Sequence, residues 1–292
     1  MIIEGLLEKI GFTDEEIEKY TEVDSIEGEK IEKYAEKYMA CNMELNTVLE
    51  EMEDETFSLS KYTINLLFVL RCTGYYRNNL LKKGISEEMI INNLKDIKCK
   101  LDECQKRYDE FGLMSISWYN LLFRENRYQL GRLQFEIEVH EGGDVTYAGH
   151  TLNNGELKLK CHIPSLGPLT KESCMDSYRK AYGFYKDYFK DGILRITLGT
   201  WLLYPPYKDV FAPDSNTAAL RKDYHIFRVR ENKNFKDGWR VFGKDITEFN
   251  TLPGDTSLQR KMAQYIENGG TFGEGDGVLF FDGEKILTKN ER

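Results

Sequence analysis

The chain has 292 residues, 41% of them hydrophobic and 30% charged, which suits a globular protein and favours two domains over one. Its formal net charge is −9. Residues 1–125 hold 16 Lys and Arg against 26 Asp and Glu, and this acidic balance disfavours nucleic-acid binding. Residues 126–292 hold 24 Lys and Arg against 23 Asp and Glu, so this half could contain a local basic pocket for an anionic ligand.

Signals for a membrane or a metal are missing from the sequence. No apolar run approaches the roughly 18 residues of a transmembrane helix, and residues 1–5 lack the basic and apolar parts of a secretory signal. The six cysteines form no Cys-x-x-Cys pair and the chain has only 4 histidines, so we expect no metal site. Scattered cysteines without a signal favour reduced thiols, a cytoplasmic location and no membrane partner.

The first 125 residues follow the 3.6-residue period of helices. Three acidic residues at 14–16 are typical of a helix start. Ser58 and Ser86 are candidate N-caps of two longer helices, which we expect to stop near Gly84 and Gly112. A shorter helix is expected at 117–123. The pattern predicts a helical domain of four or five helices over residues 1–125.

From residue 126 the period changes to two, which indicates strands. Apolar and polar residues alternate over 132–140 and again over 156–163, and Asn154-Gly155 predicts a hairpin turn. A strand with little alternation follows at 192–204 and ends at Pro205-Pro206. Further strands are expected at 223–231 and 277–283, and helices at 170–189 and 255–270. The order predicts a mixed sheet domain over residues 126–292, so the fold class is α+β.

Three polar side chains are candidates for acid–base chemistry. Glu136 and His162 lie on the polar faces of two predicted strands, and they flank a reacting amine if those strands share a sheet face. The alternative is that both are solvated. Tyr204 stands beside two prolines, where it is either a proton donor or an aromatic residue at a rim. We expect Cys174 in the core, and the glycine-rich residues 269–277, which follow a helix, as a flexible connection.

The loop after residue 163 is a candidate anion site. A strand ends there and a helix opens at Thr170, so free backbone N–H groups and the positive end of a helix come together. Pro164 and Pro168 offer no N–H. The expected binding groups are the N–H groups of Leu166, Gly167, Leu169 and Thr170, with the charge of Lys171. The alternative is a capped helix after a rigid turn that binds nothing.

Four short sequences together resemble a known bacterial family. They are RYQLGRLQFE, HIPSLGPLT, TWLLYP and LPGDTSLQRKM, in this order. The chain is similar to two-domain N-acyltransferases, in which a helical N-terminal domain precedes a GNAT-like domain. The resemblance covers nearly the whole chain. It implies acyl-CoA as co-substrate, an amine on a small molecule or peptide as acceptor, and residues 162–173 as the place where the pantetheine pyrophosphate docks.

The sequence departs from that family at two places. The GNAT pyrophosphate signature Gln/Arg-x-x-Gly-x-Gly/Ala is replaced by SLGPLT at residues 165–170. Relatives tend to carry His-Ser before Trp-Leu-Leu, whereas this chain has Gly199-Thr200. Two functions follow as hypotheses. One is acyl-CoA-dependent N-acyl transfer with Glu136 or His162 as base, directly or through water, and Tyr204 as proton donor. The other is a ligand-binding or protein-interaction module that has lost catalysis.

Overall fold

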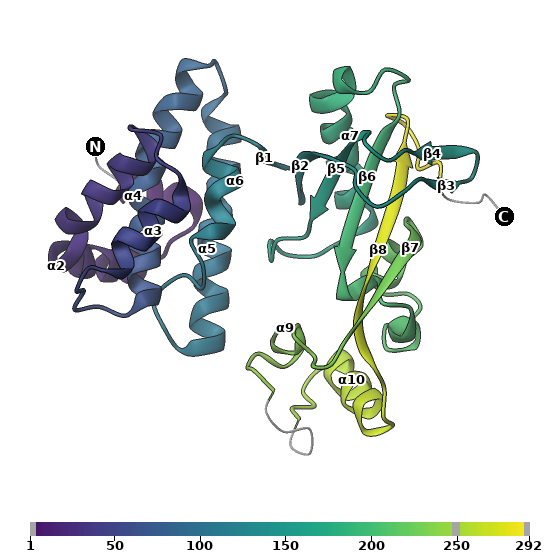
Figure 1. Ribbon diagram of the computed structural model, residues 1–292. Coiled ribbons are helices and arrows are strands. Elements are labelled where there is room, and N and C mark those ends of the chain that lie inside the picture. Colours follow the sequence, from purple (N-terminus) through teal and green to yellow (C-terminus); the bar gives the residue numbers. More distant parts are fainter. Residues whose placement is uncertain (1–3, 247–251, 289–292) are drawn as a thin grey trace. The chain divides into compact units, whose positions relative to one another are not determined.

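A computed structural model describes residues 4–246 and 252–288. Its contacts divide the chain into two compact units, residues 1–128 and 129–292. Helices fill the first unit and a mixed sheet with helices forms the second, so the chain is α+β, as the sequence predicts (Figure 1). Among the described helices, none is both long enough and apolar enough to cross a membrane.

Side-chain caps fix the ends of the helices in the first unit. Thr13 and Glu16 form a capping box before the second helix, and Ser86 caps α5 as predicted. The predicted cap Ser58 is wrong: its N–H and hydroxyl both donate to Glu27 Oε1, and Ser60 caps α4 instead. The elements are α1 (Glu4–Ile10), α2 (Asp14–Met39), α3 (Leu45–Glu53), α4 (Lys61–Lys82), α5 (Glu87–Tyr108), η1 (Ser117–Tyr119) and α6 (Asn120–Phe123).

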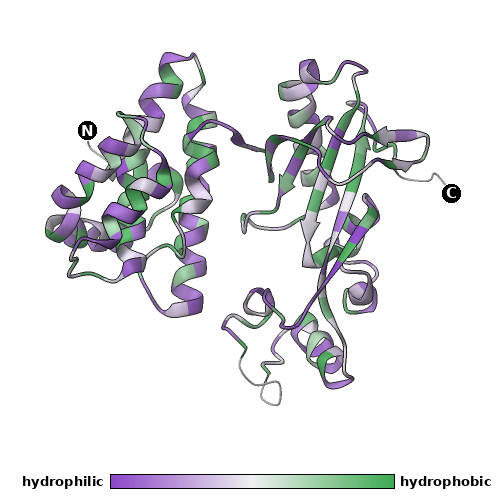
Figure 2. Cartoon of the chain, in the orientation of Figure 1, coloured by the Kyte–Doolittle hydropathy of each residue, from purple (hydrophilic) through white to green (hydrophobic). Residues whose placement is uncertain are grey.

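Helix α4 is the centre of the helical unit. Its residues 66–70 are all buried, because α2 packs on one side and α5 on another. The other helices bury one face each and carry hydrophilic residues on the outside, as the alternating colours of Figure 2 show. The resulting core joins residues from every helix of this unit.

The sheet of the second unit has six strands in the order β1-β2-β5-β6-β8-β7. Neighbours β5 and β6 are parallel, while β2–β5, β6–β8 and β7–β8 are antiparallel. The strands are β1 (Arg127–Leu130), β2 (Leu133–Val139), β5 (Leu157–His162), β6 (Leu194–Thr200), β7 (His225–Asn232) and β8 (Phe272–Phe281). Two further short strands, β3 (Val145–Tyr147) and β4 (His150–Leu152), form a separate hairpin.

Helices and turns connect these strands. Thr170 caps α7 (Lys171–Tyr185), as the sequence predicts, and Thr256 caps α10 (Ser257–Glu267). The remaining elements are η2 (Lys186–Tyr188), η3 (Trp201–Leu203), η4 (Pro205–Asp209), α8 (Asn216–Arg221) and α9 (Gly238–Phe242). Helix α7 covers one face of the sheet, where the Tyr185 hydroxyl donates to the Phe135 carbonyl. The hairpin β3–β4 packs on Val278 and Phe280 of the opposite face.

Three details of the sheet unit differ from the sequence prediction. The β3–β4 hairpin turns at Ala148-Gly149, whereas Asn154-Gly155 lies in the turn before β5. Strand β6 ends at Thr200 instead of the prolines, because the Thr200 side chain accepts from Leu202 N–H and starts η3.

The glycine-rich stretch 269–277, expected to be a flexible connection, is for the most part a strand: residues 272–277 form the first half of β8. Its alternate glycines leave room for the chain that follows β6. A Cβ on Gly275 would lie 2.6 Å from the Leu203 carbonyl oxygen, and one on Gly277 would lie 2.8 Å from Tyr224 Cβ. Glycine is required here because another segment approaches the strand closely.

Candidate active site

The parallel strands β5 and β6 part at their carboxyl ends. Their ladder pairs Leu159 with Ile196 and Lys160 with Thr197. Strand β5 then runs on to His162, while β6 continues to Thr200 paired with β8 on its other side. Ligands of open α/β sheets bind outside the carboxyl ends of parallel strands, where the chain turns away. The end of this ladder is therefore the natural place for a ligand in the sheet unit.

A buried carboxylate lies beside that point. Glu136 on β2 is 2% exposed, and the β2–β5 register places it opposite Lys160. Its Oε1 lies 3.3 Å from Lys160 Nζ, and its Oε2 lies 3.2 Å from Nε2 of His162. The sheet thus brings Glu136 and His162 together on one face, and neither is the solvated side chain of the alternative interpretation.

This trio suits proton transfer. A carboxylate next to an imidazole orients the ring and stabilises the imidazolium once it has taken up a proton. Both oxygens of Glu136 already face a nitrogen, so His162 is the better placed of the two to meet a substrate. Lys160, which was not among the residues predicted from the sequence, balances the charge of the carboxylate. Its signal was the β-strand spacing, since Lys160 and His162 are two residues apart on one face.

Tyr204 does not lie at a rim. It is 0% exposed, and its hydroxyl lies 2.7 Å from Thr271 Oγ1. Its ring packs against Tyr207, in a cluster that also contains Trp201. The predicted rim position is wrong because β6 ends at Thr200, and η3 folds the following residues under the start of β8.

Cys174 is buried as expected. Burial raises the pKa of its thiol to about 11, so the group stays protonated near neutral pH and is no nucleophile.

The loop before α7 has an open face and a fixed one. Gly167 has φ +78, and a Cβ there would meet nothing within 4 Å. The N–H groups of Gly167, Leu169 and Thr170 donate to no acceptor in the described part of the chain. Leu166 drops out of the predicted set, because its N–H donates to the Pro164 carbonyl at 2.9 Å. Lys171, the first residue of α7, is exposed.

Arg132 holds this loop from the turn between β1 and β2. Its guanidinium donates to the carbonyl oxygens of Gly167 at 3.0 Å and Pro168 at 3.3 Å. Its backbone N–H donates to Ser177 Oγ of α7 at 2.8 Å. These contacts turn two carbonyls toward Arg132. Arg132 was not predicted from the sequence, where its only signal is its place directly after Gly131 in a tight turn between two strands.

Gly199 faces a buried carboxylate on the neighbouring strand. A Cβ at this position would lie 2.7 Å from Asp276 Oδ1. Asp276 accepts from Arg228 Nε at 2.6 Å and from Arg230 Nη2 at 2.9 Å. Burial alone would raise the pKa of Asp276, but these hydrogen bonds outweigh it and hold the pKa below its usual range. The space that a larger residue 199 would need is therefore filled by Asp276.

Metal ligands do not gather in the described residues: no group of three or more His, Cys, Asp or Glu side chains is placed to hold an ion. The site just described consists of backbone N–H groups, a carboxylate, an imidazole and an ammonium group. Such a set suits an anionic organic ligand and a proton transfer.

Two domain families match the chain. Residues 1–124 match the N-acyltransferase N-terminal domain, and residues 127–279 match the GNAT-like C-terminal domain. No curated protein matches.

Solved structures share the fold over 94% of this chain and 86% of theirs, with a TM-score of 0.71. They include an acyltransferase in complex with decanoyl-CoA and teicoplanin, at 18% identity, and an acyltransferase in complex with decanoyl-CoA, at 19% identity.

Proposed function

The chain belongs to the family in which an N-acyltransferase N-terminal domain precedes a GNAT-like C-terminal domain, and on this premise we propose that it transfers an acyl group from acyl-coenzyme A to an amine. The observation that supports this most is the pair Glu136–His162 beside the parting strands β5 and β6. The acyl-CoA complexes of the similar acyltransferases support the choice of donor.

The loop at 166–170 is proposed to bind the pyrophosphate of the donor. The N–H groups of Gly167, Leu169 and Thr170 point to no acceptor in the described structure, and the space above Gly167 is open. Helix α7 adds about half a positive charge at its first turn, and Lys171 adds a full charge that salt screens more strongly. No glycine signature is needed, because backbone groups and the helix end supply the donors.

The proposed reaction is attack of the amine nitrogen on the thioester carbonyl. His162 takes the proton that the amine loses as the new C–N bond forms. The C–S bond breaks, and coenzyme A leaves as a thiolate, which takes up one proton from the imidazolium of His162 or from solvent water. Glu136 orients His162 and stabilises its charged form. We do not assign the thiolate's proton to Tyr204, because that hydroxyl is buried and bonded to Thr271.

The acceptor is proposed to be an amine on a small molecule or a peptide. The glycopeptide teicoplanin in one similar structure is consistent with this class. A cytoplasmic location is proposed as well, because all six cysteine thiols are free, the state that a reducing compartment maintains.

The test is release of coenzyme A thiol from decanoyl-CoA in the presence of a panel of amines, with the acylated product identified by mass. Thiol release that depends on the amine is the expected result, and His162→Gln should reduce it strongly. Binding of coenzyme A without turnover by any amine would favour the second function, a binding module that has lost catalysis. If the protein neither binds coenzyme A nor releases its thiol with any amine, both functions are rejected.

A further inference from the structure

A pocket in the sheet unit, lined by none of the residues of the candidate active site, is strongly cationic. It lies between η4, α8, the start of β7 and α10, and has a volume of about 410 Å³. Its lining is Lys208, Asp209, Phe211, Pro213, Ala218, Arg221, Lys222, Ile226 and Lys261. Four cations thus face one carboxylate. The whole segment 126–292 has a net charge of only +1, so this pocket concentrates positive charge.

Arg221 is the most enclosed of these cations. It is half-buried, and Nη1 donates to the carbonyl oxygens of Leu202 and Tyr204, the latter at 3.2 Å. Its guanidinium also lies 5.6 Å from the ring centroid of Phe211. Burial lowers the pKa of Arg221, and no carboxylate of the described residues forms an ion pair with it. A desolvated charge without a counter-charge favours the arrival of an anion.

The three lysines are uncompensated in the same way. Neither Lys208, Lys222 nor Lys261 has an acidic partner within ion-pair distance in the described parts of the chain. Lys261 is half-buried, while Lys208 and Lys222 are exposed at the mouth.

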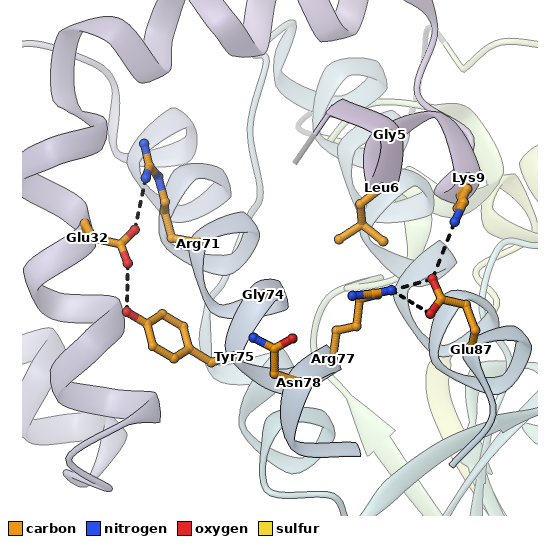
Figure 3. A pocket seen from close by; sticks show the side chains of 10 residues that line it. All are labelled: Gly5, Leu6, Lys9, Glu32, Arg71, Gly74, Tyr75, Arg77, Asn78 and Glu87. Carbon is orange, nitrogen blue, oxygen red and sulfur yellow. Dashed lines mark hydrogen bonds and ion pairs between the residues drawn. The ribbon is translucent and has the colours of Figure 1, made fainter. Parts of the chain in front are cut away.

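In a pocket of the helical unit, by contrast, carboxylates of the chain itself neutralise the cations. That pocket, drawn in Figure 3, has a volume of about 520 Å³. Arg71 lies 3.0 Å from Glu32, and Arg77 lies 2.7 Å from Glu87, which Lys9 also approaches at 3.4 Å. Every cation there faces a carboxylate of the chain. The pocket at α8 has the opposite character and is open to a counter-ion from outside.

The rest of the lining indicates what the anion is attached to. Phe211, Pro213, Ala218 and Ile226 contribute apolar surface next to the cations. Ligand sites combine such surface with a few charged groups that fix orientation. A phosphate group takes up the lysine and arginine charges, and a flat ring fits against the apolar residues.

We propose that the pocket between η4, α8 and α10 binds a phosphate monoester carried on a ring. Two sources share this chemistry: the 3′-phosphorylated adenosine of coenzyme A, and a separate phosphorylated small molecule. The proposal does not depend on acyl transfer, since binding alone tests it.

The experiment is calorimetric titration of the full chain at fixed ionic strength with adenosine 3′,5′-bisphosphate, and with adenosine as the uncharged probe. The variant is Lys222→Ala/Lys261→Ala, because Arg221 also supports the backbone of η3. Lys190→Ala, an exposed lysine outside the pocket, is the control. The bisphosphate should bind wild type and control alike and the double variant at least about tenfold more weakly, since two charge-assisted contacts are lost. Adenosine should not distinguish the three proteins.

Equal affinity of the bisphosphate for wild type and double variant, or no binding to wild type, would overturn the proposal. Thermal unfolding of the double variant verifies that it is folded. Coenzyme A and dephospho-coenzyme A then identify the source. If the coenzyme is the source, wild type binds coenzyme A more tightly than dephospho-coenzyme A, and this difference in affinity disappears in the double variant. If the ligand is a separate molecule, the double substitution leaves the difference in affinity between the two coenzymes unchanged, and the bisphosphate still binds protein that is saturated with coenzyme A. Loss of acyl transfer would affect neither result.

Discussion

At the scale of single residues, Glu136 decides whether the site works as proposed. It is the most buried carboxylate on its strand, and it faces both His162 and Lys160. Glu138, two residues along on the same face, makes the matching ion pair with Lys158 at 2.9 Å but is partly exposed. The two positions share their chemistry and differ in their distance from His162.

Glu136→Gln is expected to lower kcat/KM for acyl transfer by about ten- to a thousandfold, because His162 loses the group that orients it and stabilises its charge. Glu138→Gln, the matched control, should stay within about twofold of wild type. Steady-state release of coenzyme A measures both. An equal effect of the two substitutions would remove Glu136 from the mechanism.

Tyr204→Phe separates a structural hydroxyl from a catalytic one. The substitution removes the hydrogen bond to Thr271, so the free energy of unfolding should fall by about 1 kcal/mol. Turnover should stay near the wild-type rate. Urea unfolding and the thiol assay give the two readings. A large loss of kcat with unchanged stability would restore the proton-donor role expected from the sequence.

Gly199 and Asp276 should depend on each other. Gly199→Ala places a methyl group against Asp276 Oδ1 and is expected to cost about 1–3 kcal/mol of stability. The same substitution in an Asp276→Ala background should cost less, because the space is then free. Chemical unfolding of the four proteins in this cycle gives the coupling. Additive effects would show that the carboxylate moves aside at no cost.

At the scale of elements, the loop and α7 act together with Arg132. Arg132→Ala releases the Gly167 and Pro168 carbonyls, so the loop should lose the conformation that leaves its N–H groups without an acceptor of the chain. Coenzyme A at a hundred times its dissociation constant should stabilise wild type by about 2.7 kcal/mol. At the same concentration it should stabilise the Arg132→Ala variant clearly less. The control is Arg179→Ala, which replaces an exposed arginine of α7 and should be stabilised as much as wild type. Thermal unfolding with and without coenzyme A measures this, and an equal shift in all three would contradict the proposal.

Gly167→Val would be a poor probe of the proposed binding loop. Gly167 has φ +78, where a β-branched residue is strained, so the ligand-free protein would be destabilised too. The open space above Gly167 does not remove that cost.

The elements that the sequence predicts best are those with local signals. Ser86 and Thr170 cap their helices because their side chains accept from N–H groups three residues on. The alternation over 133–139 likewise reports a real strand. The start of β8 was not predicted, because its glycines are required by the close approach of Leu203 and Tyr224, which are far away in the sequence. The contacts of Arg132 with the Gly167 and Pro168 carbonyls and the burial of Tyr204 were not predicted either, because they depend on tertiary contacts alone.

At the scale of the whole molecule, the chemistry proposed for this family member lies in residues 129–292, which form a compact unit. Its sheet supplies the pair Glu136–His162, its loop before α7 supplies free N–H groups, and the pocket at α8 supplies uncompensated cations. The acidic helical unit balances the charges of its own pocket.

The most direct test of the central claim is a crystal structure of the protein with coenzyme A. We expect the pyrophosphate within hydrogen-bond distance of the N–H groups of Gly167, Leu169 and Thr170, and the thiol end between β5 and β6 near His162. Coenzyme A bound elsewhere on the chain, with this loop empty and His162 away from the thiol, would contradict it.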